Sequence, residues 1–439
     1  MSFWIWGGFL KQLAGGLQWA VFLIASSIAA PIAIAHVFGM DAAETASFIQ
    51  RTMFVLGTAC VVQAVIGHRL PINEGPAGLW WGIFVVYANM VGILYATADD
   101  ALQALQTGMI VSGVLFILLA AFGFISKMKR LFTPTVTFTY LMLLIFQLSG
   151  TFIKGMVGVE TSADPIDGIV FIGSLLTVIV TFITMYHKVT WVSKYSVLLS
   201  IGFGWIVFIL LGKAQSIHTT SNSIVRFPEV FVYGKPVWDS GVVVTAFFIT
   251  LLLIANMMAS IRVMENLLKH SFQKEVSDRT REGSIASGIN HLLAGVFSAI
   301  GPVPISGSAG FVGTTRMASL RPFIIGSLLV MIMTLFPAIM SFFAALPAPV
   351  AYAVTFAIFA KMVELAFAEM EMENDKTIGY RVSALGLMIG VGLMFVPTES
   401  MMHLPAILSA VLSNGLIIGT LVAITVEQFL RAMKKRRSV

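Results

Sequence analysis

Apolar runs of membrane-spanning length recur along the whole chain, and charged residues gather in the short segments between them. A helix needs ~20 apolar residues to cross the ~30 Å hydrocarbon core of a bilayer. The pattern therefore predicts an all-α polytopic membrane protein with about 14 spans. The predicted spans are residues 17–38, 49–67, 77–95, 107–125, 135–156, 168–186, 195–211, 242–261, 286–301, 308–317, 322–345, 350–367, 382–396 and 404–426.

The composition excludes a water-soluble globule, because 58% of the residues are hydrophobic and only 11% are charged, against roughly a quarter charged in soluble domains. The sequence pI near 9.4 does not indicate a nucleic-acid partner, since the basic residues lie between apolar runs. The expected surroundings are a lipid bilayer. Cys60 is the only cysteine, which excludes an intrachain disulfide and a cysteine-based metal cluster. We expect no cofactor, and an amphipathic surface helix over residues 1–18 rather than a signal peptide.

Loop charges predict the orientation of the chain. Four basic groups fall on one side when the spans are counted: Lys127, Lys129 and Arg130; Lys188 and Lys194; Lys269, Lys274, Arg279 and Arg281; and Lys434, Lys435, Arg436 and Arg437. The opposite loops are acidic, with Asp41 and Glu44, Asp99 and Asp100, and Glu160, Asp164 and Asp167. Basic loops stay in the cytoplasm, so we expect a multi-pass protein of the cytoplasmic membrane with both termini inside. One inner loop is acidic instead, with Glu369, Glu371, Glu373 and Asp375.

An internal repeat accompanies the two shortest predicted spans, the third and the tenth. The sequence GPAGLWWG at 75–82 resembles GSAGFVG at 307–313, and a Pro-Ile pair precedes each, at 71–72 and 304–305. In this match Gly75, Ala77 and Gly78 correspond to Gly307, Ala309 and Gly310. The copies are an odd number of spans apart, as in transporters built from inverted repeats with broken helices. The free N–H groups at such half-helix starts favour a polar or anionic ligand, although the glycines could serve helix packing alone.

Several segments resemble the nucleobase–ascorbate transporters (nucleobase:cation symporters), in particular the bacterial purine/xanthine permeases. Gln18-Trp19 is similar to a Gln-His pair in the first span of that family, and LFTPTV at 131–136 to the start of its fifth span. Residues 308–316 fall on the family signature, in which Asn-x-Gly precedes Thr-Arg/Lys by a fixed spacing. Gly310, Thr315 and Arg316 fit that spacing, with Ser308 at the Asn position. LPAPV at 346–350 resembles the start of the twelfth span.

The resemblance implies two inverted seven-span repeats that form a core domain (spans 1–4 and 8–11) and a gate domain (spans 5–7 and 12–14). On this chain the core would be residues 17–130 and 242–345, and the gate 131–212 and 346–427. An N-terminal segment (1–16), an external loop (213–241) and a basic tail (428–439) complete the chain. The family binds a nucleobase between the third, eighth and tenth segments, usually couples uptake to H+ or Na+, and often forms homodimers through its gates.

The candidate site departs from the family at its usual carboxylates. The substrate-holding carboxylate of the eighth span falls at Asn256, the next polar position of that helix at Ser260, and the base-contacting Glu or Gln of the tenth segment at Gly307. Asn256 could still donate to and accept from a purine edge, but it could also bond a neighbouring helix. The predicted substrate contacts are Gly78, Trp80, Asn256, Ser260, Ser306, Gly307 and Ser308.

Other readings of these residues remain open. Ser260 could bond its own helix backbone, and tryptophans such as Trp80 and Trp81 are more often core or interfacial residues. Glu74 is the candidate for cation coupling, because ionisable groups inside a membrane are commonly functional. Alternatively, Glu74 lies in the preceding loop and pairs with His68 or Arg69.

We therefore predict a secondary transporter for a nucleobase, most simply a purine such as xanthine, uric acid, guanine or hypoxanthine, working by movement of core against gate. The alternative is an anion transporter of the sulfate-permease type, which shares the fold. An enzyme is not expected, because the sequence has no nucleophile elbow, phosphate loop or metal-ligand cluster.

Overall fold

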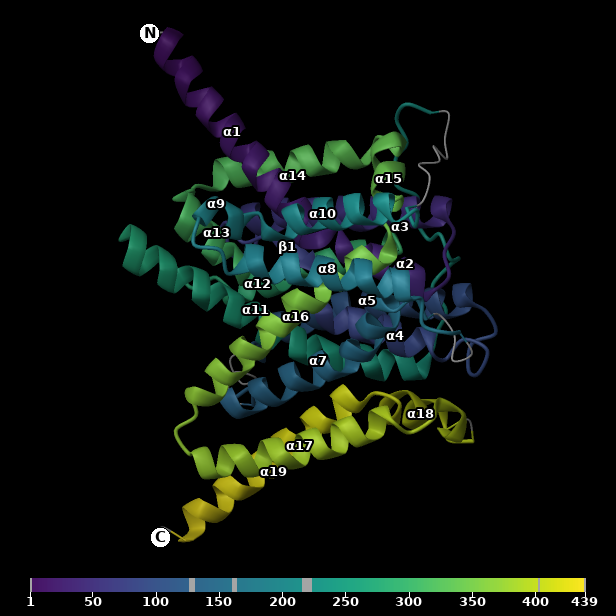
Figure 1. The fold of residues 1–439 in the computed structure, drawn as a ribbon. Helices are drawn as coiled ribbons and strands as arrows, with labels where there is room; N and C mark the ends of the chain where they lie inside the picture. The colour runs from purple at the N-terminus through teal and green to yellow at the C-terminus, as the bar shows by residue number, and fades with distance from the viewer. Residues whose placement is uncertain (1, 126–130, 160–163, 215–222, 402, 438–439) are drawn as a thin grey trace.

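The computed structural model describes residues 2–125, 131–159, 164–214, 223–401 and 403–437 (Figure 1). The predicted basic loop with Lys127, Lys129 and Arg130, and the acidic Glu160, lie outside these ranges. The helices of the first half are α1 (Ser2–Ser27), α2 (Ala29–Val37), α3 (Ala42–Val65), α4 (Gly78–Ala88), α5 (Ala98–Ala121), α7 (Pro134–Met156), α8 (Gly168–Met185), α9 (Thr190–Lys194) and α10 (Ser196–Leu210).

The second half contains α11 (Ser240–Phe272), α12 (Thr280–Val296), α13 (Gly307–Thr315), α14 (Leu320–Thr334), α15 (Pro337–Ala344), α16 (Ala348–Glu371), α17 (Lys376–Met394), α18 (Ala406–Leu412) and α19 (Gly415–Arg437), with a 3-10 turn at Thr398–Met401. Two short strands, β1 (Glu74–Pro76) and β2 (Pro302–Pro304), form the sheet of the described chain. The predicted all-α membrane fold is confirmed.

Nine helices of the described residues are long and apolar enough to cross a membrane, or ten if the bent pair α13–α14 counts as one span. The axes of α13 and α14 meet at 120°. The predicted third and tenth spans are indeed short, since α4, which begins at Gly78, has 11 residues and α13, which begins at Gly307, has 9. The number of about 14 spans remains a prediction.

Polar residues begin several of these helices where their N–H groups lack intrahelical partners. Asp41 forms a capping box with Glu44 at α3, and Thr97 forms one with Asp100 at α5. Asp167 accepts from two N–H groups at the start of α8. Part of the acidity assigned to the outer loops is therefore helix capping, which also places negative charge at the positive end of each helix dipole.

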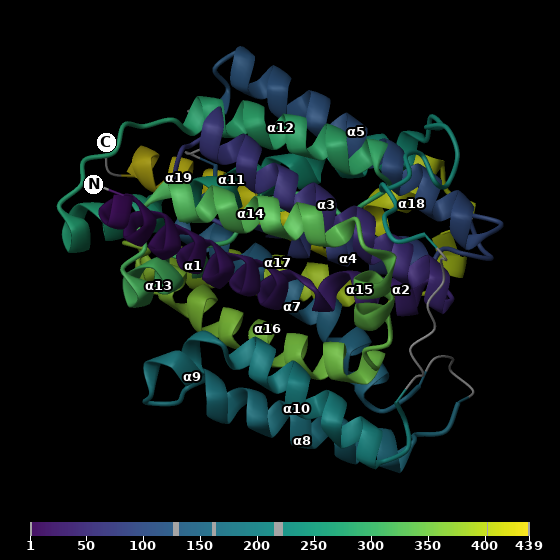
Figure 2. The ribbon, with the colours of Figure 1, turned by 90° about the horizontal axis from the view of Figure 1, so that it is seen from above.

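The helices pack in two groups (Figures 1 and 2). In the first group α1 and α3 pack on α14, and α5 packs on α11 and α12. In the second, α7 packs on α16, α17 and α19, while α8 packs on α10 and α16. Figure 1 shows α17 and α19 along one edge of the molecule, and Figure 2 shows α8–α10 along another. The groups meet where α2 contacts α16, α4 contacts α7 and α11 contacts α18.

Both ends of the chain lie at the same end of the helix bundle in both views. The acidic loop that departs from the charge pattern is at this end, and two of its carboxylates, Glu373 and Asp375, are paired with the basic tail. Arg431 donates to Glu373 at 2.9 Å and Lys434 to Asp375 at 2.6 Å. Part of the acidity of this loop thus serves ion pairs with the cationic end of α19.

Candidate functional site

The two strands pair antiparallel in the middle of the molecule and each leads into a short helix. Glu74 lies opposite Pro304, and Pro76 opposite Pro302. Backbone hydrogen bonds extend the pairing, with Ala77 N donating to Gly301 O at 2.9 Å and Ile305 N to Asn73 O at 2.8 Å. Helices α4 and α13 leave the strands toward opposite ends of the molecule in both views. Both half-helix starts therefore face the same central region.

The structure changes the register of the internal repeat. Gly75 lies within β1, whereas Gly307, its match in sequence, is the first residue of α13. The first residue of α4 is Gly78, so Gly78 and Gly307 are the structurally equivalent positions. The sequence match was displaced because Gly and Ala recur at short intervals in both copies, whereas the strands and helix starts fix the register by backbone pairing.

Two of the predicted contact residues are bonded to the strand region itself. Ser260 Oγ on α11 donates to the carbonyl oxygen of Pro304 at 2.7 Å, and Ser308 Oγ accepts from Asn73 N at 2.8 Å. Asn73 Nδ2 in turn donates to Ser26 Oγ on α1 at 2.8 Å. Both serine hydroxyls are buried. They hold the two half-helix starts in place, because proline-rich strands offer few N–H groups for pairing.

The remaining predicted contacts differ from these two serines in exposure and hydrogen bonding. Asn256 lies one turn before Ser260 on α11, the helix that packs against β2, α4 and α13. Its side chain is partly exposed and forms no hydrogen bond with a described residue. Ser306 is partly exposed and Gly307 is exposed. At Gly78 an added Cβ would lie 3.4 Å from Phe359 Cζ, so this half-helix start abuts α16.

Trp80 and Trp81 point in different directions from α4, because successive helical residues are turned by about 100°. The Trp80 ring is buried near His291, with 6.3 Å between ring centroids, and it closes over Gly301. It therefore packs against α12, away from the second helix group. Trp81 instead meets Phe152 of α7 at 5.3 Å and Phe359 of α16 at 6.0 Å. The tryptophan at the junction of the two groups is Trp81, not Trp80.

Glu74 is fully buried and lies in β1 rather than in the preceding loop. Its Oε1 is 3.8 Å from Nε2 of His68, which is also buried. Arg69 is not its partner, since Arg69 is exposed and its Nε donates to Val65 O at 2.9 Å. Neither carboxylate oxygen of Glu74 has a hydrogen-bond partner among the described residues. The structure thus places Glu74 in the interior, as the first interpretation expects, and beside His68, as the alternative expects. Its role in cation coupling stays a prediction.

Two residues, Lys194 and Phe359, were not predicted to lie in this region. Lys194, at the end of α9, donates to Gln18 Oε1 of α1 at 3.5 Å and lies 4.6 Å from the centroid of the Phe311 ring of α13. It thereby connects the second helix group to the first. Phe359 forms the wall opposite Gly78. Neither has a sequence signal, because one is a loop cation and the other lies in a uniform apolar run.

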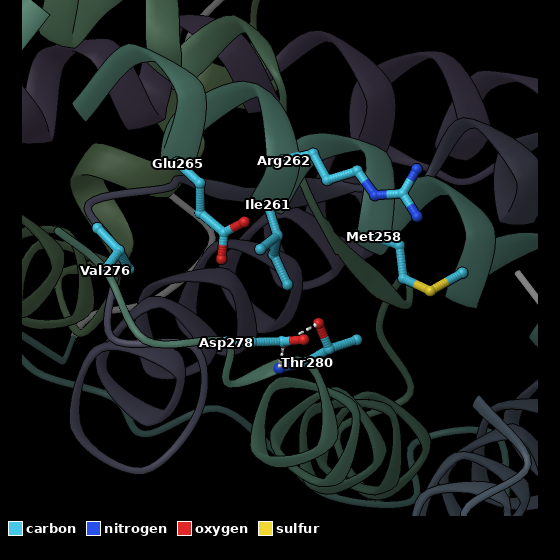
Figure 3. Close-up of a pocket in the computed structure, with 7 residues that line it drawn as sticks. All are labelled: Met258, Ile261, Arg262, Glu265, Val276, Asp278 and Thr280. Atoms are coloured by element: carbon cyan, nitrogen blue, oxygen red, sulfur yellow. Dashed lines mark hydrogen bonds between the residues drawn. The ribbon is translucent and has the colours of Figure 1, made fainter. Parts of the chain in front are cut away.

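A cleft of about 180 Å³ opens beside the C-terminal half of α11 (Figure 3). It is lined by Met258, Ile261, Arg262, Glu265, Val276, Asp278 and Thr280. Asp278 turns toward Thr280 and accepts from its N–H and hydroxyl groups, and the guanidinium of Arg262 points away from them. The cleft does not include the predicted substrate contacts. It is a polar opening between α11 and the start of α12.

Comparisons with known proteins agree with this architecture. The model of the Permease family, the xanthine/uracil permeases, matches residues 10–399. The putative purine permease YwdJ of Bacillus subtilis (strain 168) is 42% identical over 433 residues, covering 98% of each chain. The xanthine permease of the same organism is 22% identical over 439 residues, covering 98% of this chain and 96% of the other.

Among solved structures, the transmembrane domain of a cyanobacterium bicarbonate transporter, BicA, has a TM-score of 0.67 at 15% identity, covering 87% of this chain and 97% of the other. Murine Slc26a9, an anion transporter, has a TM-score of 0.63 at 12% identity, covering 97% of this chain and 68% of the other. At these identities the likeness concerns the fold alone.

The fold, with its paired strands and opposed half-helices, defines a membrane transporter built from two inverted repeats. The chain belongs to the nucleobase–ascorbate transporter family, whose model spans most of its length. It is accordingly a permease and not an enzyme.

Proposed function

We propose that this permease carries a nucleobase, most simply a purine such as xanthine, uric acid, guanine or hypoxanthine. The observation that carries the proposal is Asn256, a side chain with both a donor and an acceptor, left without a described partner beside the half-helix starts. An oxopurine edge presents the complementary acceptors and donors. The names of similar proteins, a putative purine permease and a xanthine permease, support the same substrate class.

In this mechanism the core (17–130 and 242–345) slides against the gate (131–212 and 346–427), exposing the site to each side in turn. Asn256 selects the edge of the base. Backbone groups at Gly78, Ser306 and Gly307 surround it, while Ser260 and Ser308 hold the strands. Trp80 stays a predicted contact, and we add Trp81, which lies at the junction of the two helix groups against the aromatic rings of α7 and α16.

Uptake by cells that express the chain, compared with the same strain carrying an empty vector, tests this function. The strain should lack its own purine permeases, and the labelled substrates should include the four purines, uracil and bicarbonate. We expect accumulation of at least one purine that the other purines inhibit. Uptake of no nucleobase would contradict the proposal.

The second candidate is an anion transporter of the sulfate-permease type. The specific observation in its favour is the pair of half-helix starts at Gly78 and Gly307, with Asn256 and Gly307 at the family positions of the usual carboxylates, which suits an anion. Sulfate or bicarbonate uptake that purines do not inhibit would favour this alternative.

We further propose that the protein lies in the cytoplasmic membrane with both termini in the cytoplasm, since the basic residues of α9, α11 and α19 would then face inward. Cysteines introduced near either terminus should react with an impermeant maleimide only after the cells are opened.

Cation coupling by H+ or Na+ and a homodimer through the gates are also part of the proposal. Cross-linking between gate helices in membranes tests the dimer.

A further inference from the structure

Two ionisable side chains lie together in the apolar interior behind the paired strands. Glu74 and His68 are each almost completely buried, and Glu74 Oε1, Glu74 Oε2 and His68 Nε2 form no hydrogen bond with a described residue. A buried charge without hydrogen bonds is costly. The carboxylate therefore needs either a proton or a nearby donor, and this requirement makes its protonation sensitive to small movements of its surroundings.

The hydrogen bonds of His68 show which of its nitrogens faces Glu74 as a donor. The backbone N–H of Leu70 donates to His68 Nδ1 at 3.0 Å, so Nδ1 carries no proton. The neutral ring then holds its proton on Nε2, the atom 3.8 Å from Glu74 Oε1. That separation is longer than a hydrogen bond. If Glu74 is deprotonated, a slight approach would shorten this separation to a hydrogen bond. A protonated Glu74 does not require that hydrogen bond.

The other ionisable groups near the pair are bonded to backbone atoms, so Glu74 is the group that changes charge. On α3 the buried Cys60 thiol accepts from Glu74 N at 3.2 Å. Arg279, at the start of α12, donates to the carbonyl oxygens of Gly67 and Ile66, and the exposed Arg69 donates to Val65. The described parts of α1 and β2 that contact β1 bring only uncharged groups, such as Ser26 and Ser27. His68 is thus the ionic partner of Glu74 among the described residues.

Glu74 is connected directly to the proposed substrate site through the strand pairing. It lies opposite Pro304 in the register, and the carbonyl oxygen of Pro304 accepts the hydrogen bond from Ser260. Ser260 is one turn from Asn256 on the same face of α11. A displacement of Glu74 therefore acts on β2 and on the helix that carries Asn256.

The cleft of Figure 3 comes near the pair through one of its lining residues, Ile261. Ile261, which lines that cleft, and His68 lie on the same side of Gly283: a Cβ at Gly283 would be 3.5 Å from His68 Cβ and 3.5 Å from Ile261 Cδ1. The Ile261 side chain is therefore close both to the cleft and to His68. The polar lining of the cleft would admit water close to the pair.

We propose that Glu74 is the proton-binding group that couples this transporter to the proton gradient, with His68 as its positioning residue. The inference rests on the proposed nucleobase transport and adds the group that does the coupling. A proton from the aqueous phase forms an O–H bond on the Glu74 carboxylate and is released from it on the other side. A neutral purine would then move with one positive charge per cycle. The role falls to β1 because Asn256 and Gly307 occupy the family positions for carboxylates.

The test uses the purified full-length chain in liposomes, with labelled xanthine as the first probe and the other three purines after it. Exchange at equal pH on both sides measures the carrier cycle. Accumulation with an acidic exterior measures coupling. We expect the wild type to do both, and Glu74→Gln to keep exchange within about twofold while gradient-driven accumulation falls at least about tenfold, to the level without a gradient. Glu275→Gln, at an exposed inner position, should behave as the wild type.

Two further variants keep the test decisive. Glu74→Asp should restore accumulation, which separates loss of the proton site from misfolding. His68→Ala should move the pH of half-maximal accumulation upward, because the donor that favours the charged carboxylate is gone, while His68→Gln should restore part of the shift. Accumulation by Glu74→Gln at the wild-type level overturns this inference alone. Absence of purine exchange by the wild type overturns the proposed function, and this inference with it.

Discussion

The polar residues around the paired strands differ in whether they already have a partner. Ser260 and Ser308 are hydrogen-bonded to the chain segments that they position, whereas Asn256 forms no hydrogen bond with a described residue. An unsatisfied amide at the edge of a site gains most from a ligand. Substitutions at these residues should therefore separate loss of substrate binding from loss of stability.

Asn256→Ala should weaken apparent purine affinity by about tenfold, corresponding to about 1.4 kcal/mol for the lost hydrogen bonds. Asn256→Asp should change the order of preference among purines, because a carboxylate accepts but cannot donate when ionised. Competition of each purine against a labelled one measures both effects.

Ser260→Ala provides the comparison on the same face of α11. Removal of the Ser260 hydroxyl leaves the Pro304 carbonyl without that donor. The melting temperature should therefore fall, while the order of purine preference stays that of the wild type. An unchanged order of preference and affinity in Asn256→Ala would remove Asn256 from the site.

Among the helices, glycine sets how closely α17 and α19 approach each other. A Cβ on Gly415 of α19 would lie 2.1 Å from the carbonyl oxygen of Gly390 on α17, and one on Gly390 would lie 2.7 Å from Gly415 O. The obstructing atoms are backbone, which cannot rotate away. Small residues commonly allow such contacts between membrane helices.

Gly390→Ala should therefore force α17 and α19 apart and cost about 1–3 kcal/mol. Gly392→Ala is the matched control, since Gly392 lies on the same helix and a Cβ there meets nothing within 4 Å. Thermal unfolding in detergent, followed by size-exclusion fluorescence, compares the two. Equal melting temperatures would show that the two helices have room to adjust.

Across the whole molecule, the cationic end of α19 returns to the loop between α16 and α17. Arg431 donates to Glu373 at 2.9 Å and to Glu427 at 2.7 Å, and Thr135 of α7 donates to Glu373 at 2.8 Å. Burial alone would raise the pKa of Glu373. Hydrogen bonds from the Asp375 N–H, Thr135 and Arg431, with the charge of Arg431, outweigh this and hold the pKa of Glu373 below its ordinary value of 4.5.

A lowered carboxyl pKa contributes stability at neutral pH that is lost as the pH falls through the folded-state pKa, below 4.5. Arg431→Gln should lower the melting temperature at pH 7 on the order of 5 °C, and its melting temperature should fall less than that of the wild type on acidification to pH 4. Arg436→Gln, at an exposed position of the same tail, is the control. Parallel pH curves for the wild type and Arg431→Gln would contradict the pairing.

The long apolar helices were predictable because their signal is local, a long run of apolar residues. The helix starts at Gly78 and Gly307 lie within a residue of the predicted starts of the third and tenth spans. Side-chain direction was not predictable, as Trp80 and Trp81 show. Both are apolar neighbours on one short helix, and only the positions of α7, α12 and α16 decide which of them meets the junction.

The sequence by itself determined a helical membrane transporter with two broken segments, because apolar length, loop charge and Gly/Pro content act within a few residues of one another. It also identified Asn256 and Glu74 as unusual polar groups. Only the tertiary structure decided what these groups touch. The pairing of Glu74 with His68, the bond from Ser260 to Pro304 and the closure of Arg431 onto Glu373 depend on packing, which brings distant segments together without a periodic signal along the chain.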